Sequence, residues 1–489
     1  MPKRILLRIG KAPFEVVNIL ESDERDVAGT NSGNMLFAQS VFKTLSIDDV
    51  EIGRHGYGAN PKRADFINEN YDAVVLPMAN SFRVAWAPAL ENYYELVRRL
   101  KIPVIVAGVG VQTDLDYNLD NLKPIDDISR RFVSAVLDRS ASIGVRGECS
   151  AAYLKKLGFP ESSIDIIGCP SMFMYGENLA IRDPGTISLD SPISINVTSA
   201  FKKGCFRNGL DLMLHLADNH IQKYRNSVVI CQESRSLTTM LWGGGKGSEF
   251  DGISPESIYE LTANKRAKFF VDPSTWFDYL SKFQFSFGTR LHGNIASILG
   301  GTPAFILAPD SRTRELAELF HIPYRRMDEI DENLDARELA ESADFSRMLN
   351  GHSALFENYV KFIKKNNLPC IYDFPGKAEE FDRRLSTERF PKAAETCAPD
   401  VIIERLGKFR RETLLTLRKL EKQVTQSERK AERLTASNRK RDSRLKKLIA
   451  MNASLDGRLD RIERRISRLG TSKLSRLRSY AKRKLKRLF

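Results

Sequence analysis

The chain has 489 residues, of which 42% are hydrophobic and 28% are charged, and its net charge is +14. This length can bury two sizeable cores, and the composition excludes a wholly disordered chain and a disulfide-dense mini-protein. A multi-span membrane protein is also excluded, because no run of about 18 uncharged apolar residues occurs.

The N-terminal segment and the cysteines favour a cytoplasmic protein. The start of the chain, MPKRILLRIG, has no apolar core followed by small residues, so we expect no secretory signal. The six cysteines show neither CxxC pairing nor metal-ligand spacing, which is typical of reduced thiols. We therefore expect no bound metal. The cysteines are Cys149, Cys169, Cys205, Cys231, Cys370 and Cys397.

The positive charge is confined to the C-terminal part. Residues 401–489 contain 29 Lys and Arg against 9 Asp and Glu, whereas residues 1–400 contain 47 against 53. The first 400 residues are therefore slightly acidic. Attraction to phosphates requires clustered positive charge, so we do not expect nucleic-acid binding by this part.

Short apolar runs alternate with helix-like stretches over more than 300 residues. This alternation predicts an α/β fold in which buried parallel strands are joined by crossover helices. We expect two doubly wound, Rossmann-like domains at 1–183 and 184–375 and a linker at 376–400, because turn residues cluster at 182–185. A ligand cleft is expected between the two domains. The predicted strands are 73–76, 103–107, 164–167, 193–197, 228–231, 269–271, 285–287 and 304–307.

Small polar residues follow several of these strands. The segment 29–34, GTNSGN, precedes a predicted helix at 35–45 and could present backbone N–H groups to an anion, although such residues also serve as ordinary helix caps. Asn80 and Gln112 occupy comparable turns. The candidate binding residues in these loops are Asn31, Gly33, Asn34, Asn80 and Gln112.

Two segments carry stronger chemistry. Arg146 stands between a short apolar strand and a helix, where its guanidinium could hold a phosphate or carboxylate. Arg290 and His292 stand two residues apart at a strand-to-helix turn, and an extended backbone directs both side chains to the same side. A cation beside a titratable imidazole suits proton transfer to an anionic substrate. The alternative for His292 is a capping or core histidine.

The segment GTRLHGNIASILGGTPAFILAPDSRTRELAELFHIPY, together with GVRGE and IIGCPS, resembles the polysaccharide pyruvyl transferase family over residues 25–325. The resemblance implies a glycosyltransferase-B-like pair of domains. It also implies transfer of a pyruvate ketal from phosphoenolpyruvate to two hydroxyls of a sugar in a cell-surface glycan. Asp310 and Glu315 lie in the most specific part of this similarity and are added to the candidate substrate-binding residues.

On that resemblance, His292 and Arg290 are the expected catalytic residues. His292 is expected to be the general acid, and Arg146 and Arg290 are expected to contact phosphoenolpyruvate and to stabilise the departing phosphate. Family members more often have Asp where this chain has Cys169, so no role is carried onto that position. The positive charge of Arg290 should lower the pKa of His292, and a bound anion should raise it. We expect no cofactor and no metal.

Two other functions remain open. A nucleotide-sugar-dependent glycosyltransferase would share the fold, and Arg290, Asp310 and Glu315 could then serve a diphosphate and a ribose. A non-catalytic protein that binds a glycan or an anion would also suit the sequence. Consumption of phosphoenolpyruvate distinguishes the first prediction from both alternatives.

The C-terminal part contains a heptad repeat, which predicts a coiled coil over 401–470. Asn438 and Asn452 occupy two a positions, which favours a parallel homodimer through residues 417–469. A single solvated helix is the alternative, because Ser427, Asn438 and Arg441 weaken the middle of the apolar seam. The a positions are Leu417, Val424, Ala431, Asn438, Leu445, Asn452, Leu459 and Ile466, and the d positions are Leu420, Ser427, Leu434, Arg441, Leu448, Leu455, Ile462 and Leu469.

The final segment, 471–489, is basic and predicts an amphipathic helix with its leucines on one face. This pattern is typical of contact with an anionic membrane surface, and dimerisation would add avidity. Nucleic acid, an acidic protein or plain solvation are the alternatives, and we favour the membrane. We therefore expect a cytoplasmic protein that is peripheral at the inner face of the membrane.

Overall fold

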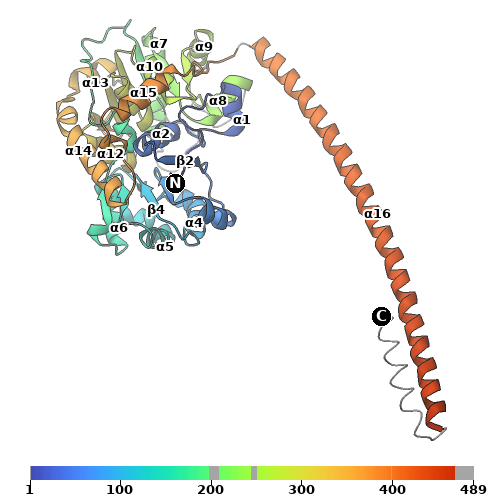
Figure 1. Cartoon of the computed structure of the whole chain (residues 1–489). Coiled ribbons are helices and arrows are strands. Elements are labelled where there is room, and N and C mark those ends of the chain that lie inside the picture. Colours follow the sequence, from blue (N-terminus) through green and yellow to red (C-terminus); the bar gives the residue numbers. More distant parts are fainter. Residues whose placement is uncertain (1, 198–208, 244–249, 398, 469–489) are drawn as a thin grey trace. The chain divides into compact units, whose positions relative to one another are not determined.

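The computed structural model describes residues 2–197, 209–243, 250–397 and 399–468 (Figure 1). Met1–Ile403 forms one compact unit, and a second unit begins at Glu404. The first unit is an α/β structure whose named strands pair in parallel, as the sequence predicts.

The first sheet has the strand order β2-β1-β3-β4. A short pair, β5 and β6, continues from it through a parallel bridge between Val109 and Val145. In this order the chain reverses its direction of winding between β1 and β3, and ligands of parallel sheets bind at such a switch point. The strands are β1 (Lys3–Leu7), β2 (Val50–Arg54), β3 (Ala73–Pro77), β4 (Val104–Ala107), β5 (Ile143–Val145) and β6 (Ile164–Ile166).

The second sheet has the strand order β12-β11-β10-β7-β8-β9. This is the doubly wound order of a dinucleotide-binding fold, with the switch point between β7 and β10. The strands are β7 (Ile193–Asn196), β8 (Val228–Cys231), β9 (Ala267–Phe269), β10 (Phe285–Gly288), β11 (Ala304–Ala308) and β12 (Tyr324–Arg326). The predicted domain boundary at 183/184 lies between β6 and β7, and the division into two domains stays a prediction.

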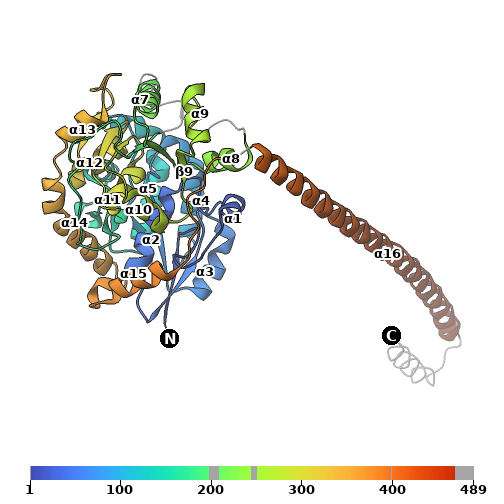
Figure 2. The same cartoon turned by 90° about the horizontal axis from the view of Figure 1, so that it is seen from above.

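Helices surround both sheets (Figures 1 and 2). They are α1 (Ile19–Arg25), α2 (Gly33–Leu45), α3 (Ala64–Asn70), α4 (Ala87–Val97), α5 (Asp126–Leu137), α6 (Glu148–Lys156), α7 (Gly209–Lys223), α8 (Ser234–Trp242), α9 (Pro255–Ala263), α10 (Pro273–Leu280), α11 (Leu291–Leu299), α12 (Ser311–Phe320), α13 (Ala336–Ser342), α14 (Ser346–Lys365), α15 (Lys377–Thr387) and α16 (Pro399–Arg468).

One hydrophobic core joins the two sheets. It contains Leu7 of β1, Phe37 of α2, Ile295 of α11 and Ile306 of β11, all of which are buried. Helices α2 and α11 contact each other within it. Because each of these helices begins at the cavity described below, the shared core holds that cavity between two sheets.

Four strands and one helix differ from the expectations. The apolar runs did not reveal β1, β2 and β12, and β9 begins two residues before its predicted position. The range 376–400, predicted as a linker, contains α15, whose Asp382 accepts two 2.7 Å hydrogen bonds from Lys43 of α2. Lys43 is buried, so this ion pair fixes α15 against the first sheet's helix layer.

The described part of the second unit belongs to α16, a helix of 70 residues that begins at Pro399 and is described as far as Arg468. The helix predicted over 401–470 is therefore confirmed for its described length, and its pairing into a coiled coil stays a prediction. The predicted amphipathic segment 471–489 lies outside the described residues. Among the described helices, none is long and apolar enough to span a membrane.

Candidate functional site

A cavity of about 140 Å³ lies where the carboxyl ends of both sheets meet. It is lined by elements of both sheets and contains four arginines and one histidine. Its lining residues are Thr30, Asn31, Asn34, Ala79, Asn80, Arg83, Arg146, Gln232, Arg290, Leu291, His292 and Arg312. This composition is typical of a site for a small anion.

The turn from β10 to α11 carries Arg290 and His292. Gly288 ends the strand with φ +143°, and a Cβ atom there would lie 2.0 Å from the carbonyl oxygen of Asn196, so only glycine fits. The amide of Asn294 donates to the carbonyl oxygens of Gly288 (3.0 Å) and Arg290 (3.3 Å). These contacts hold the turn at the switch point of the second sheet.

Arg290 is restrained by two neighbours. Its Nε donates to the carbonyl oxygen of Val197 (2.9 Å), and its Nη2 forms an ion pair with Glu233. The carboxylate compensates much of the positive charge of Arg290. Arg290 therefore shapes the cavity while presenting a partly neutralised cation to it.

Arg146 enters the cavity from the end of β5. The side chain is 2% exposed, and its Nε donates to the carbonyl oxygen of Gly108 (3.0 Å) while its guanidinium lies over the ring of Phe37. Its Nη2 is buried and has no hydrogen-bond partner. Burial lowers the pKa of Arg146, and the charge of Arg312 acts in the same direction. A buried cation with an unused donor stabilises a bound anion strongly.

Arg312 enters from the beginning of α12 and is positioned by a chain of polar side chains. Its Nε donates to both carboxylate oxygens of Asp310, at 2.9 and 3.1 Å. Asp310 also accepts from Nε2 of Gln112 (3.0 Å), whose Oε1 accepts from Asn80 (2.6 Å). The chain crosses from the loops of the first sheet to α12, so it orients Arg312 relative to both sheets.

His292 lies between α2 and the loop after β6. A Cβ atom on Gly33 would be 2.5 Å from its Nδ1, so the first turn of α2 approaches the imidazole closely. Its Nε2 lies 3.6 Å from Sγ of Cys169. Desolvation by burial, and then the positive charges of Arg146 and Arg312, lower the pKa of His292 to about 3. Without an anion, the imidazole is neutral at pH 7.

The charges that act on His292 therefore differ from the expected one. The sequence indicated Arg290, which is two residues away, but Arg290 is paired with Glu233. Arg146 and Arg312 lie far from His292 in the sequence and act on it through space. The expected direction of the shift without a ligand is nevertheless the observed one.

Glu315 lies outside the cavity lining and holds two elements together. Its carboxylate accepts from the backbone N–H (2.7 Å) and the hydroxyl (3.0 Å) of Ser150 in the first turn of α6. Burial raises the pKa of Glu315 to about 7. Glu315 thereby links α12, which carries Arg312, to the turn that carries Arg146.

The predicted site residues thus occupy three kinds of place. Those that line the cavity are Asn31, Asn34, Asn80, Arg146, Arg290 and His292. Gly33 lies against the imidazole, and Gln112, Asp310 and Glu315 support the lining from outside it. Sequence reasoning missed Thr30, Arg83, Gln232 and Arg312. Arg312 had a signal, because it stands two residues after Asp310 in the segment that carries the family resemblance.

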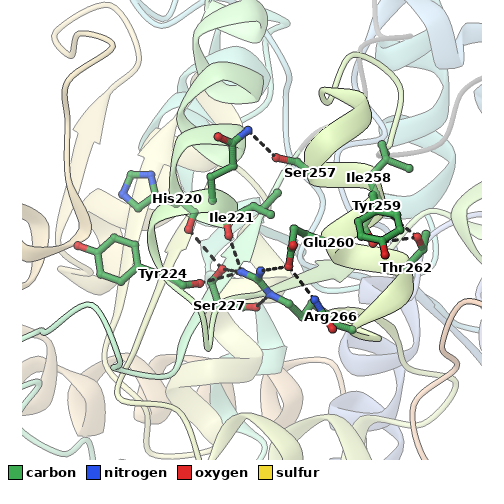
Figure 3. Close-up of polar contacts among 12 residues, drawn as sticks. His220, Ile221, Tyr224, Ser227, Ser257, Ile258, Tyr259, Glu260, Thr262 and Arg266 are labelled. Atoms are coloured by element: carbon green, nitrogen blue, oxygen red, sulfur yellow. Dashed lines mark hydrogen bonds and ion pairs between the residues drawn. The ribbon is translucent and has the colours of Figure 1, made fainter.

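A larger hollow of about 880 Å³ lies between α7 and α9 (Figure 3). Its buried arginine, Arg266, donates to the carbonyl oxygens of Ile221, Tyr224 and Ser227, each at 2.7 Å. Arg266 also forms an ion pair with Glu260. The guanidinium therefore caps the end of α7, and we assign this hollow a structural role. Arg146 differs, because its buried Nη2 has no hydrogen-bond partner.

No group of three or more His, Cys, Asp or Glu residues in the described part of the chain could hold a metal ion. The candidate site consists of cations, amides and an imidazole, which are poor ligands for a hard cation because they supply no carboxylate to the cavity. The expected absence of a metal stays a prediction.

Comparison with known structures finds distant similarities. An uncharacterized protein from Klebsiella pneumoniae is 11% identical over 65% of this chain and 87% of its own, with a TM-score of 0.33. The S. aureus MnaA–UDP structure is 10% identical over 80% and 99%, with a TM-score of 0.36. The UDP-GlcNAc 2-epimerase from Methanocaldococcus jannaschii is 12% identical over 74% and 99%, with a TM-score of 0.38. A search of curated proteins finds no match.

A family model described as polysaccharide pyruvyl transferase matches residues 31–311. This range is more than half of the chain, and it begins at Asn31 in the cavity and ends beside Asp310. It includes the loops that carry Arg146 and the turn that carries Arg290 and His292. The chain belongs to the polysaccharide pyruvyl transferase family.

Proposed function

We propose that this protein transfers a pyruvate ketal from phosphoenolpyruvate to a sugar diol of a cell-surface polysaccharide and releases phosphate. Membership of the family implies a transferase with a polysaccharide acceptor. The observation that carries the donor assignment is the convergence of Arg146 and Arg312, from opposite sheets, beside the neutral imidazole of His292. No cofactor takes part in the proposed reaction.

The arginines supply an anion site that is formed before the donor binds. The charge of Arg312 lowers the pKa of Arg146, and the charges of both arginines lower the pKa of His292. A phosphate or carboxylate placed between them relieves their mutual repulsion and pairs with the free Nη2 of Arg146. The donor carries both anionic groups, so it can engage both arginines at once.

The proposed chemistry begins with a proton on His292. The imidazolium gives this proton to the methylene carbon of phosphoenolpyruvate, which becomes a methyl group, and C2 becomes electrophilic. A sugar hydroxyl adds to C2 and loses its proton. Phosphate then leaves with the C2–O bond electrons, stabilised by Arg146 and Arg312, and the second hydroxyl closes the ketal as its proton is released. One hydroxyl proton restores His292, and the other accompanies phosphate.

The size of the cavity favours this donor over a nucleotide sugar. Sites for drug-sized ligands are usually about 300–1,000 Å³, and this cavity is about 140 Å³. A small three-carbon anion suits the smaller volume. Glycosyl transfer from a nucleotide sugar remains the second candidate, since parallel sheets with this strand order bind nucleotides at the same switch point.

The proposal is tested by measuring phosphate release from phosphoenolpyruvate in the presence of a panel of sugar diols. We expect release that depends on both substrates and falls about 10² to 10⁴-fold in His292→Ala, the range of general acid catalysis. Release of a nucleoside diphosphate from a nucleotide sugar would establish the second candidate instead. Binding of phosphoenolpyruvate with no turnover on any diol would leave a binding protein.

Two further associations belong to the proposal. A second copy of the chain would associate through residues 417–469, and residues 471–489 would contact an anionic membrane at the cytoplasmic face, where glycans are assembled on lipid carriers. Deleting 471–489 should abolish sedimentation with anionic vesicles and leave turnover of a soluble acceptor unchanged. Undiminished sedimentation of the shortened chain would refute the membrane contact.

A further inference from the structure

Helix α16 presents a row of exposed apolar side chains, which is interrupted at Ser427, Asn438, Arg441 and Asn452. Leu417, Leu434 and Leu445 are 49%, 59% and 57% exposed, and they belong to the a and d positions of the heptad repeat. At 1.5 Å per residue, the helix is about 105 Å long. Isolated helices of this length with an apolar stripe are stabilised by a partner helix.

The charges that flank this stripe are separated by sign. Every charged residue at an e position is acidic, and every charged residue at a g position is basic. The acidic residues are Glu421, Glu428, Asp442, Asp456 and Glu463. The basic g residues of the helix part whose side chains are described are Lys430, Arg444 and Arg458. The e and g positions border the contact between paired helices and set their orientation.

In an antiparallel pair, e positions face e positions and g positions face g positions. Full overlap then places Glu421 opposite Glu463, and it places Asp442 opposite its own copy. On the other border, Lys430 faces Arg458. Shifting the overlap by whole heptads changes the partners but keeps acid against acid and base against base, so every such alignment is repulsive.

In a parallel, in-register pair, each g residue faces the e residue that follows it in the partner helix. Arg458 then faces Glu463, and Gln423 faces Glu428. Neither border brings two like charges together, because Lys430, Arg444 and the remaining acidic residues face uncharged side chains. The charges at the e and g positions therefore favour the parallel pair over the antiparallel pair mainly because they repel each other in the antiparallel one.

We propose that α16 binds a second copy of itself in parallel and in register, and that the separated charges at its e and g positions select this orientation. Both copies of the C-terminal segment then follow the same end of the helix pair. This inference rests on the association through residues 417–469 proposed above and adds what selects its orientation; its tests need no pyruvyl transfer.

Cysteine crosslinking of the full chain tests the orientation. Ala431 is an a residue, so Ala431→Cys chains should form a disulfide-linked dimer on mild oxidation, above the level of the parent chain. Ala453→Cys, which places a thiol at the outward b position, is the matched control and should crosslink no more than the parent.

An antiparallel pair would instead place residue 431 opposite Leu455. Preferential disulfides between Ala431→Cys and Leu455→Cys chains would overturn the proposal, as would a monomeric parent in sedimentation equilibrium.

A charge reversal gives opposite results for the two orientations. Arg458→Glu faces Glu463 in a parallel pair and should raise the dimer dissociation constant by roughly fourfold to thirtyfold, the effect expected when two symmetric surface pairs change sign. Arg458→Glu with Glu463→Arg should restore it. In an antiparallel pair, Arg458→Glu faces Lys430 and would strengthen the dimer.

The control is Arg461→Glu, which makes the same change of charge at an outward c position. We expect its dissociation constant to stay within twofold of the parent. A stronger dimer in Arg458→Glu, or the same small effect as in Arg461→Glu, would overturn the assignment of orientation to the border charges.

Discussion

Binding of phosphoenolpyruvate should bring one proton onto His292. The pKa of this residue is about 3 without a ligand, so placing a proton on it at pH 7 costs about 5 kcal/mol. A negative charge about 4 Å away, at an effective dielectric constant of about 20, returns roughly 4 kcal/mol. The donor carries more than one negative charge, so its electrostatic attraction to the imidazolium should exceed the cost of protonation. His292 should therefore be protonated in the donor complex.

Isothermal titration calorimetry measures this proton directly. Titrations of phosphoenolpyruvate at pH 7, in buffers with different heats of ionisation, give the number of protons taken up on binding. We expect His292→Gln to take up nearly one proton fewer than the parent, because glutamine cannot be protonated at this position. Thermal unfolding of the two proteins checks that the substitution leaves the fold intact.

Equal proton uptake by the two proteins would refute the reasoning. That result would mean that His292 stays neutral in the donor complex and that the proton for the methylene carbon comes from another group. The part of the uptake that is lost in His292→Gln should be larger at pH 6 than at pH 8, because the free imidazole, with a pKa of about 3, is neutral at both pH values and the protonated fraction in the complex falls as pH rises.

Three further substitutions follow from the contacts around the cavity. Asp310→Asn removes the carboxylate that orients Arg312 and should raise the KM for phosphoenolpyruvate about tenfold in steady-state assays. The melting temperature should change little. In the parent, the free energy of unfolding should fall by about 3 kcal/mol as pH rises from 4.5 to 7, because the folded chain keeps the proton of Glu315, whose pKa is about 7, whereas the unfolded chain loses it. Glu315→Gln should abolish this pH dependence, as measured by denaturant unfolding. Gly33→Ala puts a Cβ atom 2.5 Å from the imidazole and should lower kcat at least about tenfold, whereas Gly58→Ala, at a position open to solvent, should keep it.

Much of the first unit could be predicted from local patterns. Buried strands such as β3, β7 and β11 are runs of apolar residues, because both faces of a central parallel strand are covered. The strands β2 and β12 were not predicted, because each lies at a sheet edge and mixes charged with apolar residues. The sequence also predicted that Arg290 and His292 lie close together, because both belong to one turn.

The sequence by itself determined the alternation of strands and helices, the β10–α11 turn, and the heptad repeat with its border charges, because each depends on residues a few positions apart. Only the tertiary structure brought Arg83, Arg146 and Arg312 into one cavity with His292, since their positions follow from strand order and helix packing. It also assigned Asp310 and Gln112 to the support of an arginine. The pKa of His292 depends on that assembly, because burial and distant charges act through space.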